Sequence, residues 1–382
     1  MRKLLVACLG LALLCACAAP GSRPLLVERS PGQELSARVA ASAARDGDAL
    51  LRAIDHSLAF VRTRPVDRAA FGPDGPRATW GDLAKSLERL RGIVPRLAAD
   101  PGLLDREFTW LQVRPEPLLT GYYEPEMDGS LEPDPRYPVP LYGLPQGLRT
   151  ADLGAFHPRW KEQTLTYRLE GQGIAPFFSR EEIDIHGALA ATETPIAWTR
   201  DPVDVFFLQV QGSGRLRLPD GSVRHVLYAG KNGHEYVSLG KVMIERGLIP
   251  AEEMSMQRIR AYLRGHPDAV PELLNANPSY VFFRLAQDGP LGAMGRTLTP
   301  MVSMATDSAF LPLGAVLAVE TELSGSDEGR TPTAFLGLAQ DRGGAIKGSR
   351  LDLFCGAGER AEFLAGHLQA RSRVFLLLKK KD

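Results

Sequence analysis

The sequence predicts a mainly β protein that begins with a helical region. Its 382 residues include 38 glycines and 29 prolines, a composition typical of short strands joined by turns. Apolar residues recur every three or four positions between residues 36 and 105, and they alternate with polar residues from about residue 110 onward. These are the periods of helices and of strands, respectively. The length suggests about two domains.

The charge balance argues against two classes of protein. Lysine and arginine together number 45, aspartate and glutamate also number 45, and the formal net charge is +0. A nucleic-acid-binding protein needs a clustered basic surface for phosphates, so no nucleic-acid partner is expected. A polybasic membrane-surface protein is excluded for the same reason. The hydrophobic content of 44% is enough to bury a sizeable core.

The N-terminus predicts export. Two basic residues precede an apolar run, residues 4–19, that is too short to span a membrane and fits a signal peptide. The run contains LCAC at 14–17, which is similar to a bacterial lipobox. We therefore expect a lipoprotein signal peptide over residues 1–16 and a lipid on the thiol of Cys17. The alternative is an ordinary signal peptide with incidental cysteines.

The residues that follow predict where the protein is held. Ala18, rather than aspartate, follows Cys17, so the bacterial signal for inner-membrane retention is missing. We expect a lipid anchor on the periplasmic face of the outer membrane. Residues 17–35 are polar and rich in proline and glycine, and they predict a tether. Cys355 is then the one free cysteine, so no disulfide is expected.

Residues 36–105 are expected to form two or three amphipathic helices. The apolar side chains repeat at helical spacing in two groups: Leu50, Leu51, Ile54, Leu58 and Val61, then Leu83, Leu87, Leu90, Val94 and Leu97. Pro101-Gly102 marks the end of this region.

Strands dominate the rest of the chain. The segment VFFLQVQ at 205–211 alternates and predicts a strand, and a second strand is expected over 223–229 after a turn. Residues 236–265 return to helical spacing. Further short strands are expected at 280–285, 315–319, 334–339 and 374–378. Residues 324–330 are expected to form an exposed hairpin loop.

Two acidic residues near the C-terminus are the strongest candidates for chemistry. Asp341 follows a strand-like segment and precedes Gly343 and Gly344, and Asp352 comes soon after. Glycines permit a turn that can bring the two carboxyl groups together, and such a pair lets one stay protonated while the other ionises. Asp307 is a third candidate. Capping a turn is the alternative role for each aspartate.

The chain resembles the membrane-bound lytic murein transglycosylase A (MltA) family over roughly residues 105–382. The matching motifs are LLTGYYEP (118–125), VFFLQVQGSG (205–214), YAGKNGHEY (228–236), LGKVMIERG (239–247), NPSYVFF (277–283) and QDRGGAIKGSRLDLF (340–354).

The resemblance implies a fold and a division of the chain. A double-psi β-barrel domain would combine residues 36–123, which include the helices, with residues 285–382. A smaller β-barrel-like domain, residues 124–284, would be inserted between these parts, with a groove between the two domains.

The resemblance also implies an activity. The family cleaves the β-1,4 bond between N-acetylmuramic acid and N-acetylglucosamine in peptidoglycan and forms a 1,6-anhydromuramic acid end. The C6 hydroxyl of the substrate replaces water, so one carboxyl can serve first as acid and then as base. By its motif this residue is Asp352, with Asp341 in support and Asp307 either supporting or structural. No cofactor or metal is expected.

Several residues of the matched motifs are candidates for binding the glycan. Amides, hydroxyls and open backbone suit sugar hydroxyls and N-acetyl groups, tyrosines can stack on sugar rings, and a lysine can meet a carboxylate. The candidates are Tyr122, Tyr123, Gln209, Gln211, Gly212, Ser213, Lys231 and Asn232. Core packing is the alternative for the tyrosines. His225 and His234 are expected to be surface or structural residues rather than catalytic ones, and Cys355 is expected to be a buried, unreactive thiol.

Two other functions remain open at this point. The chain could bind peptidoglycan without cutting it, although the two aspartates argue against this, or it could use water at the same bond as a muramidase does. The expected partners are glycan strands of peptidoglycan and, through the lipid, the outer membrane. Protein partners in cell-wall synthesis or division are not identified by the sequence.

Overall fold

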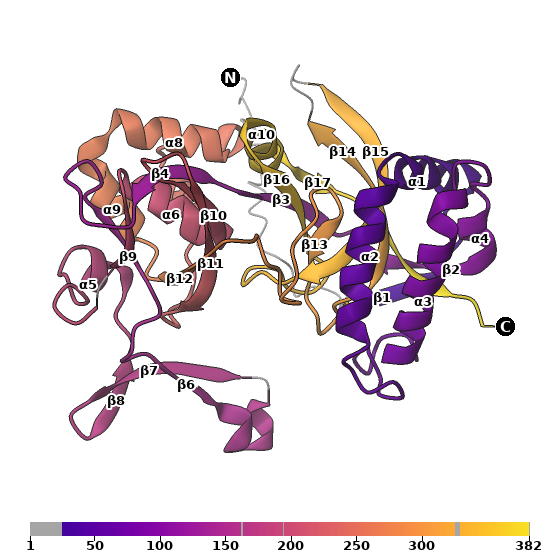
Figure 1. Ribbon diagram of the computed structural model, residues 1–382, viewed down its shortest axis with the longest axis horizontal. Coiled ribbons are helices and arrows are strands. Elements are labelled where there is room, and N and C mark those ends of the chain that lie inside the picture. The colour runs from indigo at the N-terminus through magenta and orange to yellow at the C-terminus, as the bar shows by residue number, and fades with distance from the viewer. Residues whose placement is uncertain (1–24, 162, 194, 325–328, 382) are drawn as a thin grey trace, which may run out of the picture.

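The computed structural model describes residues 25–161, 163–193, 195–324 and 329–381. The predicted signal peptide, Cys17 and the first part of the predicted tether lie outside these residues. Within them, the chain forms two larger sheets, a small third sheet and a group of N-terminal helices (Figure 1).

The largest sheet has nine strands, in the order β1-β2-β18-β14-β15-β13-β16-β3-β17. Their bounds are β1 Leu25–Glu28, β2 Phe108–Arg114, β3 Leu118–Glu124, β13 Ser303–Ala305, β14 Val316–Ser324, β15 Arg330–Asp341, β16 Leu351–Ala357, β17 Gln369–Arg371 and β18 Arg373–Lys379. The sheet therefore combines strands from both ends of the chain. Among the described strands, no pairing closes it into a barrel.

The second sheet has six strands, in the order β12-β11-β10-β4-β9-β5, and the third has three, β6-β7-β8. Their bounds are β4 Glu126–Ser130, β5 Val139–Tyr142, β6 Arg149–Asp152, β7 Thr164–Glu170, β8 Gly173–Pro176, β9 Pro195–Thr199, β10 Ser213–Arg217, β11 Val223–Lys231 and β12 Val281–Ala286. All of these strands come from the middle of the chain.

Helices cover both larger sheets. The α-helices are α1 Gln33–Arg45, α2 Gly47–Val61, α3 Trp80–Ile93, α4 Leu103–Glu107, α5 Arg180–Asp184, α6 Pro202–Gln211, α7 Leu239–Glu245, α8 Met256–Gly265, α9 Val270–Asn275 and α10 Glu359–His367. Short 3-10 helices are η1 Val94–Arg96, η2 Leu153–Ala155, η3 Pro158–Trp160, η4 Ala251–Glu253 and η5 Pro267–Ala269. In Figure 1, α1 to α4 lie together at one end of the molecule, against the nine-stranded sheet.

The main hydrophobic core lies between these N-terminal helices and the nine-stranded sheet. Ile54 of α2 and Leu87 of α3 are fully buried, and they belong to one cluster with Leu338 of β15 and Leu376 of β18. Removing such side chains from water is the main stabilising contribution to the fold. On the helical side of this core, the buried residues include most of the side chains that repeat at helical spacing in the sequence.

The structure confirms the mainly β class with N-terminal helices. The helices expected within residues 36–105 are present, and α3 begins with a capping box in which Thr79 and Asp82 satisfy each other's backbone N–H groups. The strands expected at 223–229 and at the four later segments are β11, β12, β14, β15 and β18. The expected hairpin is present as the β14–β15 pair, although residues 325–328 of its loop lie outside the described residues.

Two predictions of local structure were wrong. Residues 205–211 form most of helix α6 rather than a strand, because Asp201 caps its first turn, Pro202 opens it, and Gly212 ends it with a φ of 82°. A short, nearly continuous apolar run does not distinguish a buried helix from a strand. Residues 25–28 of the predicted tether instead form β1, which pairs with β2 along the edge of the large sheet.

The chain passes between the two larger sheets twice. The first crossover is short, because β3 of the nine-stranded sheet leads through Pro125 directly into β4 of the six-stranded sheet. The second crossover is residues 287–302, between β12 and β13. Figure 1 shows β3 and β4 as one path through the middle of the molecule. Both crossovers reach the candidate site described below.

Gly129→Ala is expected to destabilise the six-stranded sheet. A Cβ on Gly129 of β4 would lie 2.5 Å from the carbonyl oxygen of Trp198 on β9 and would also press on Leu216 of β10. We expect the free energy of unfolding, measured with denaturant, to fall by roughly 1–3 kcal/mol because of this overpacking. Gly147→Ala is the control, since a Cβ there meets no atom within 4 Å. Equal losses in the two variants would contradict the packing argument.

Candidate active site

Four adjacent strands of the nine-stranded sheet bring two aspartates onto one face. Ala305 of β13 pairs with Asp341 of β15 on one side and with Asp352 of β16 on the other. Asp352 in turn pairs with Thr120 of β3. Residues directly opposite each other in neighbouring strands point to the same face of a sheet. The two aspartates singled out in the sequence thus flank one small residue, with Thr120 continuing the row.

Asp352 is a partly exposed carboxyl group in an apolar setting. The hydroxyl of Thr120 donates a hydrogen bond to its Oδ1 over 2.7 Å, and within the described residues no hydrogen bond reaches its Oδ2. The pKa of Asp352 is raised to about 6: burial is the largest cause and the charge of Asp341 adds to it, whereas the Thr120 hydrogen bond and the charge of Arg350 act in the opposite direction. A carboxyl group with this pKa is divided between its two protonation states near neutral pH.

Asp341 has a different environment. Its Oδ2 accepts a hydrogen bond from the hydroxyl of Tyr122 over 2.8 Å, and its Oδ1 accepts the N–H groups of Ala293 and Arg342, each over 2.9 Å. Burial raises the pKa of Asp341, and these three donors act in the opposite direction. Both oxygens of Asp341 are therefore engaged, whereas Asp352 keeps one free.

Asp307 fastens a loop rather than joining this row. It follows β13, and its carboxylate accepts the N–H of Gly348 over 2.8 Å and that of Ala309 over 3.1 Å. Gly348 belongs to the loop that connects Asp341 to Asp352, so Asp307 holds that loop against the end of β13. Asp307 is partly exposed, but among the described contacts none joins it to Asp352.

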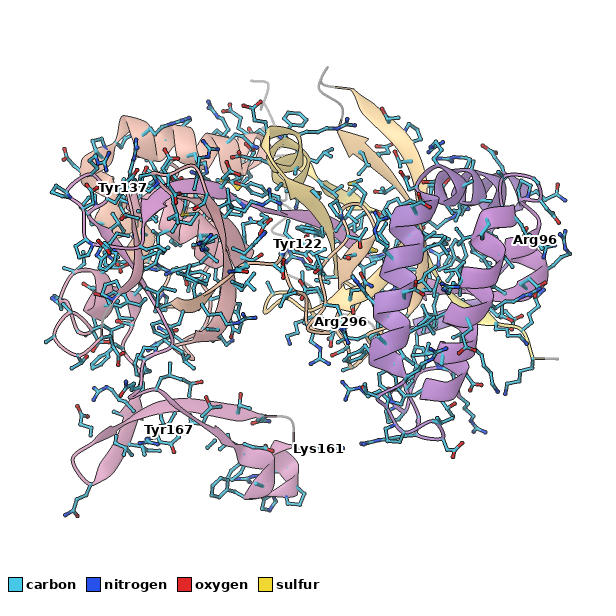
Figure 2. All side chains as sticks on the ribbon, viewed as in Figure 1. Arg96, Tyr122, Tyr137, Lys161, Tyr167 and Arg296 are labelled. Carbon is cyan, nitrogen blue, oxygen red and sulfur yellow. The ribbon has the colours of Figure 1, made fainter. Side chains whose placement is uncertain are left out.

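The two tyrosines of β3 point to opposite faces. Tyr122 is largely buried and packs on Phe354, with 5.3 Å between the ring centroids. Figure 2 places Tyr122 near the middle of the molecule, between its two larger parts. Tyr123 is 3% exposed and packs with Cys355 on the other face. In this structure neither ring offers an open face, so stacking on a sugar stays a prediction.

The two glutamines lie on helix α6. Gln209 is buried, accepts a hydrogen bond from the guanidinium of Arg180, and donates one to the carbonyl of Val281. Gln211 is partly exposed, and its Oε1 accepts the backbone N–H of Tyr123 over 3.0 Å. Gln209 thus forms internal hydrogen bonds with Arg180 and Val281, and Gln211 connects α6 to β3.

The remaining binding candidates differ in their exposure. Gly212 ends α6 and Ser213 begins β10, both partly exposed, and Lys231 is exposed at the end of β11. Asn232 is almost fully buried, and its Nδ2 donates to the carbonyls of Phe178 and Pro278, each over 2.9 Å. The structure therefore uses the amide of Asn232 internally, while Lys231 and Ser213 remain accessible.

Three residues of the site were missed in the sequence: Thr120, Arg350 and Ala293. The sequence could have indicated Thr120, because it lies two positions before Tyr122 and so shares its face of β3. It could also have indicated Arg350, because this residue precedes β16 and lies only two positions from Asp352 in the sequence. The sequence could not have indicated Ala293, because this residue contributes only a backbone N–H from the second crossover.

Cys355 lies behind the site, on the face of β16 opposite to Asp352. It is 7% exposed, and burial raises the pKa of its thiol to about 12. The thiol is therefore protonated near neutral pH and is a poor nucleophile, in agreement with the buried, unreactive thiol expected from the sequence.

Comparison with known proteins assigns this chain to a family. The family model described as the MltA specific insert domain matches residues 118–284, and the 3D domain model matches residues 302–378. Membrane-bound lytic murein transglycosylase A of Escherichia coli strain K12 is 34% identical over 350 residues, which cover 84% of this chain and 92% of the relative. The chain belongs to the MltA family.

Other members of the MltA family support the assignment. The Vibrio cholerae membrane-bound lytic murein transglycosylase A is 34% identical over 266 residues, which cover 68% of this chain and 65% of that protein. The crystal structure of the Agrobacterium tumefaciens membrane-bound lytic murein transglycosylase has a TM-score of 0.77 and 31% identity, covering 93% of this chain and 98% of that one. E. coli MltA with bound chitohexaose has a TM-score of 0.67 and 27% identity, covering 87% and 90%.

Thr120→Val is expected to raise the pKa of Asp352 in this MltA-family chain. The substitution removes the hydroxyl that stabilises the ionised carboxyl while it preserves the shape of the side chain. A hydrogen bond to a charged group contributes about 1.5–3 kcal/mol, so we expect the pKa of Asp352 to rise by roughly one to two units. Titration by carbon-13 NMR of the aspartate carboxyl groups measures it, with Asp352→Asn to assign the signal. A fall in this pKa would contradict the assigned hydrogen bond.

Proposed function

We propose that Asp352 is the single acid and base of a peptidoglycan lytic transglycosylase that forms 1,6-anhydromuramic acid ends. Membership of the MltA family makes the chain a peptidoglycan lytic transglycosylase. The assignment to one residue is supported by an asymmetry between the two aspartates: Asp341 has both oxygens engaged by three donors, whereas Asp352 has one oxygen free.

The proposed reaction balances with one carboxyl group. Protonated Asp352 gives its proton to the glycosidic oxygen, and the bond from that oxygen to the anomeric carbon breaks. The C6 hydroxyl of the muramic acid attacks the anomeric carbon, and its proton passes to the Asp352 carboxylate. The residue is thereby restored. A pKa of about 6 suits both steps, because neither form of the carboxyl is strongly disfavoured near neutral pH.

The two alternative functions fit the site less well. A glycosidase that uses water needs a second carboxylate as nucleophile or base, and the hydrogen bonds to Asp341 leave it poorly placed for either role. A protein that only binds glycan has no need of a partly exposed carboxyl with a raised pKa, which is a common mark of catalytic sites. Gln211, Ser213 and Lys231 are the proposed glycan-binding side chains that remain accessible, and Tyr122 and Asp341 hold the site together.

Attachment to the outer membrane through a lipid on Cys17 is also part of the proposal. It rests on the lipobox-like sequence at residues 14–17 and on the absence of aspartate at position 18. The relatives named above are membrane-bound by name. Within the described residues, no helix combines the length and the apolar composition needed to cross a bilayer.

Digestion of purified peptidoglycan tests the reaction. We expect the enzyme to release muropeptides that end in 1,6-anhydromuramic acid, because the C6 hydroxyl rather than water completes the reaction. Mass spectrometry separates the outcomes, since a reducing end is heavier than an anhydro end by one water. Reducing ends would support the muramidase, and the lack of any soluble product would support the binding protein.

Asp352→Asn is expected to abolish turnover and to stabilise the fold at neutral pH. Folding raises the pKa of Asp352 to about 6 from about 3.9 in an unfolded chain. The folded state binds the proton more tightly, so the ionised side chain lowers the free energy of unfolding as the pH rises through this window.

The amide removes that destabilisation. We expect a gain of about 1–3 kcal/mol near pH 7.5 and almost none near pH 3, measured by denaturant unfolding. Asp288→Asn, at an exposed position of the second crossover, is the control and should stay active and unchanged in stability. An active Asp352→Asn variant would rule out the catalytic assignment.

A further inference from the structure

A fully buried carboxylate lies where the chain first crosses between the two larger sheets. Glu124 is the last residue of β3, and its backbone pairs with Ala357 in the nine-stranded sheet. Its side chain is 0% exposed and is held by two residues of the six-stranded sheet. The Nε of Arg215 on β10 donates to Oε2 over 2.7 Å, and Nδ1 of His225 on β11 lies 2.7 Å from Oε1. Glu124 thus belongs to one sheet by its backbone and to the other by its side chain.

The second crossover meets the first at the same place. The ring of His225 packs against Gly289, where a Cβ would lie 3.1 Å from the imidazole. Four residues further along this crossover, the N–H of Ala293 donates to Asp341. His225 therefore lies between Glu124 of the outgoing chain and Gly289 of the returning chain, where the two crossovers meet.

The strand that ends at Glu124 also holds both aspartates. Thr120, Tyr122 and Glu124 occupy alternate positions of β3 and so share a face. Thr120 donates to Asp352 and Tyr122 donates to Asp341. At about 3.3 Å per residue, Glu124 lies roughly 13 Å along the strand from Thr120, so it does not touch the reacting atoms itself.

Burial of the Glu124 carboxylate favours a single arrangement of this junction. A buried charge that loses its partner is strongly unfavourable, so Glu124 holds the position in which both Arg215 and His225 reach it. The backbone supports this position, because the N–H of Arg215 donates to the carbonyl of Pro125 over 2.7 Å and Gln211 accepts the N–H of Tyr123. A shift of the inserted domain would therefore be passed to β3.

We propose that Glu124 is a positioning residue through which the inserted domain holds β3, and with it the two aspartates, in the catalytic arrangement. The proposal rests on the role of Asp352 proposed above. It predicts that loss of the contacts of Glu124 with Arg215 and His225 changes the pKa of Asp352 by displacing Thr120. Lower stability alone, or the lost negative charge, would not act by this route.

The sign of the change in pKa distinguishes these routes. Glu124→Gln keeps the size of the side chain but removes its charge. Loss of a nearby negative charge would by itself lower the pKa of Asp352. Weakening of the Thr120 hydrogen bond raises it, because that bond favours the ionised form. We expect a rise of roughly half a unit to one unit, measured by carbon-13 NMR titration, which requires no turnover.

A double-mutant cycle with Thr120→Val completes the test. If Glu124 acts through Thr120, Glu124→Gln raises the pKa of Asp352 in the wild-type background and does not raise it in the Thr120→Val background. Glu320→Gln is the matched control, because Glu320 also has two basic partners, Arg38 at 2.8 Å and Arg373 at 3.2 Å, but lies on β14 away from the site. Glu320→Gln should leave the pKa of Asp352 unchanged even if it lowers the melting temperature.

His225 provides a second pair of variants in case Glu124→Gln does not fold. His225→Asn keeps a donor close to the position of Nδ1 and should preserve the pKa of Asp352, whereas His225→Leu removes the donor and should raise it. An unchanged pKa in Glu124→Gln and in His225→Leu, or an equal rise with and without Thr120, would overturn the proposal. Because digestion of peptidoglycan by the wild type is scored separately, failure of this test does not depend on failure of the proposed function.

Discussion

A carboxyl group removed from water must be hydrogen-bonded, paired with a charge or protonated, and the centre of the large sheet contains all three solutions. Asp341 is satisfied by three donors, Glu124 is paired with two basic side chains, and Asp352 has only one donor and a raised pKa. Burial raises the pKa of both aspartates, but three donors support the ionised form of Asp341 and only one supports that of Asp352. Asp352 is therefore the less well stabilised of the two carboxylates.

Much of the fold could be predicted because its signals are local. The apolar spacing of α2 and α3, and the turn signals around β11 and β14–β15, are contained in short windows of sequence. Helix α6 was mistaken for a strand because its decisive features are its ends, Asp201 with Pro202 and then Gly212, rather than its apolar middle. Strand β1 was mistaken for tether because its edge pairing with β2 depends on residues far along the chain.

The site was predictable only in part. Asp341 and Asp352 stand out in the sequence, and the sheet register brings them to either side of Ala305. The supporting donors do not stand out, because Ala293 acts through its backbone and Thr120 acts from a distant part of the chain. The binding candidates with side-chain amides also had a second interpretation. Gln209 and Asn232 satisfy buried backbone and side-chain groups in the middle part of the chain, a task that requires the same chemistry as binding a sugar.

The pairing of the first and last parts of the chain has a consequence for biosynthesis. Thr120 and Asp352 are 232 positions apart, and β3 has neighbours in the large sheet only after β16 and β17 have been made. Long-range strand pairing of this kind forms late in folding. The inserted segment can fold earlier, since its six-stranded sheet is drawn from consecutive residues. A chain still being synthesised therefore lacks the pairing that places Thr120 beside Asp352. The assembled site, and with it the activity, can form only after the C-terminal strands have been made.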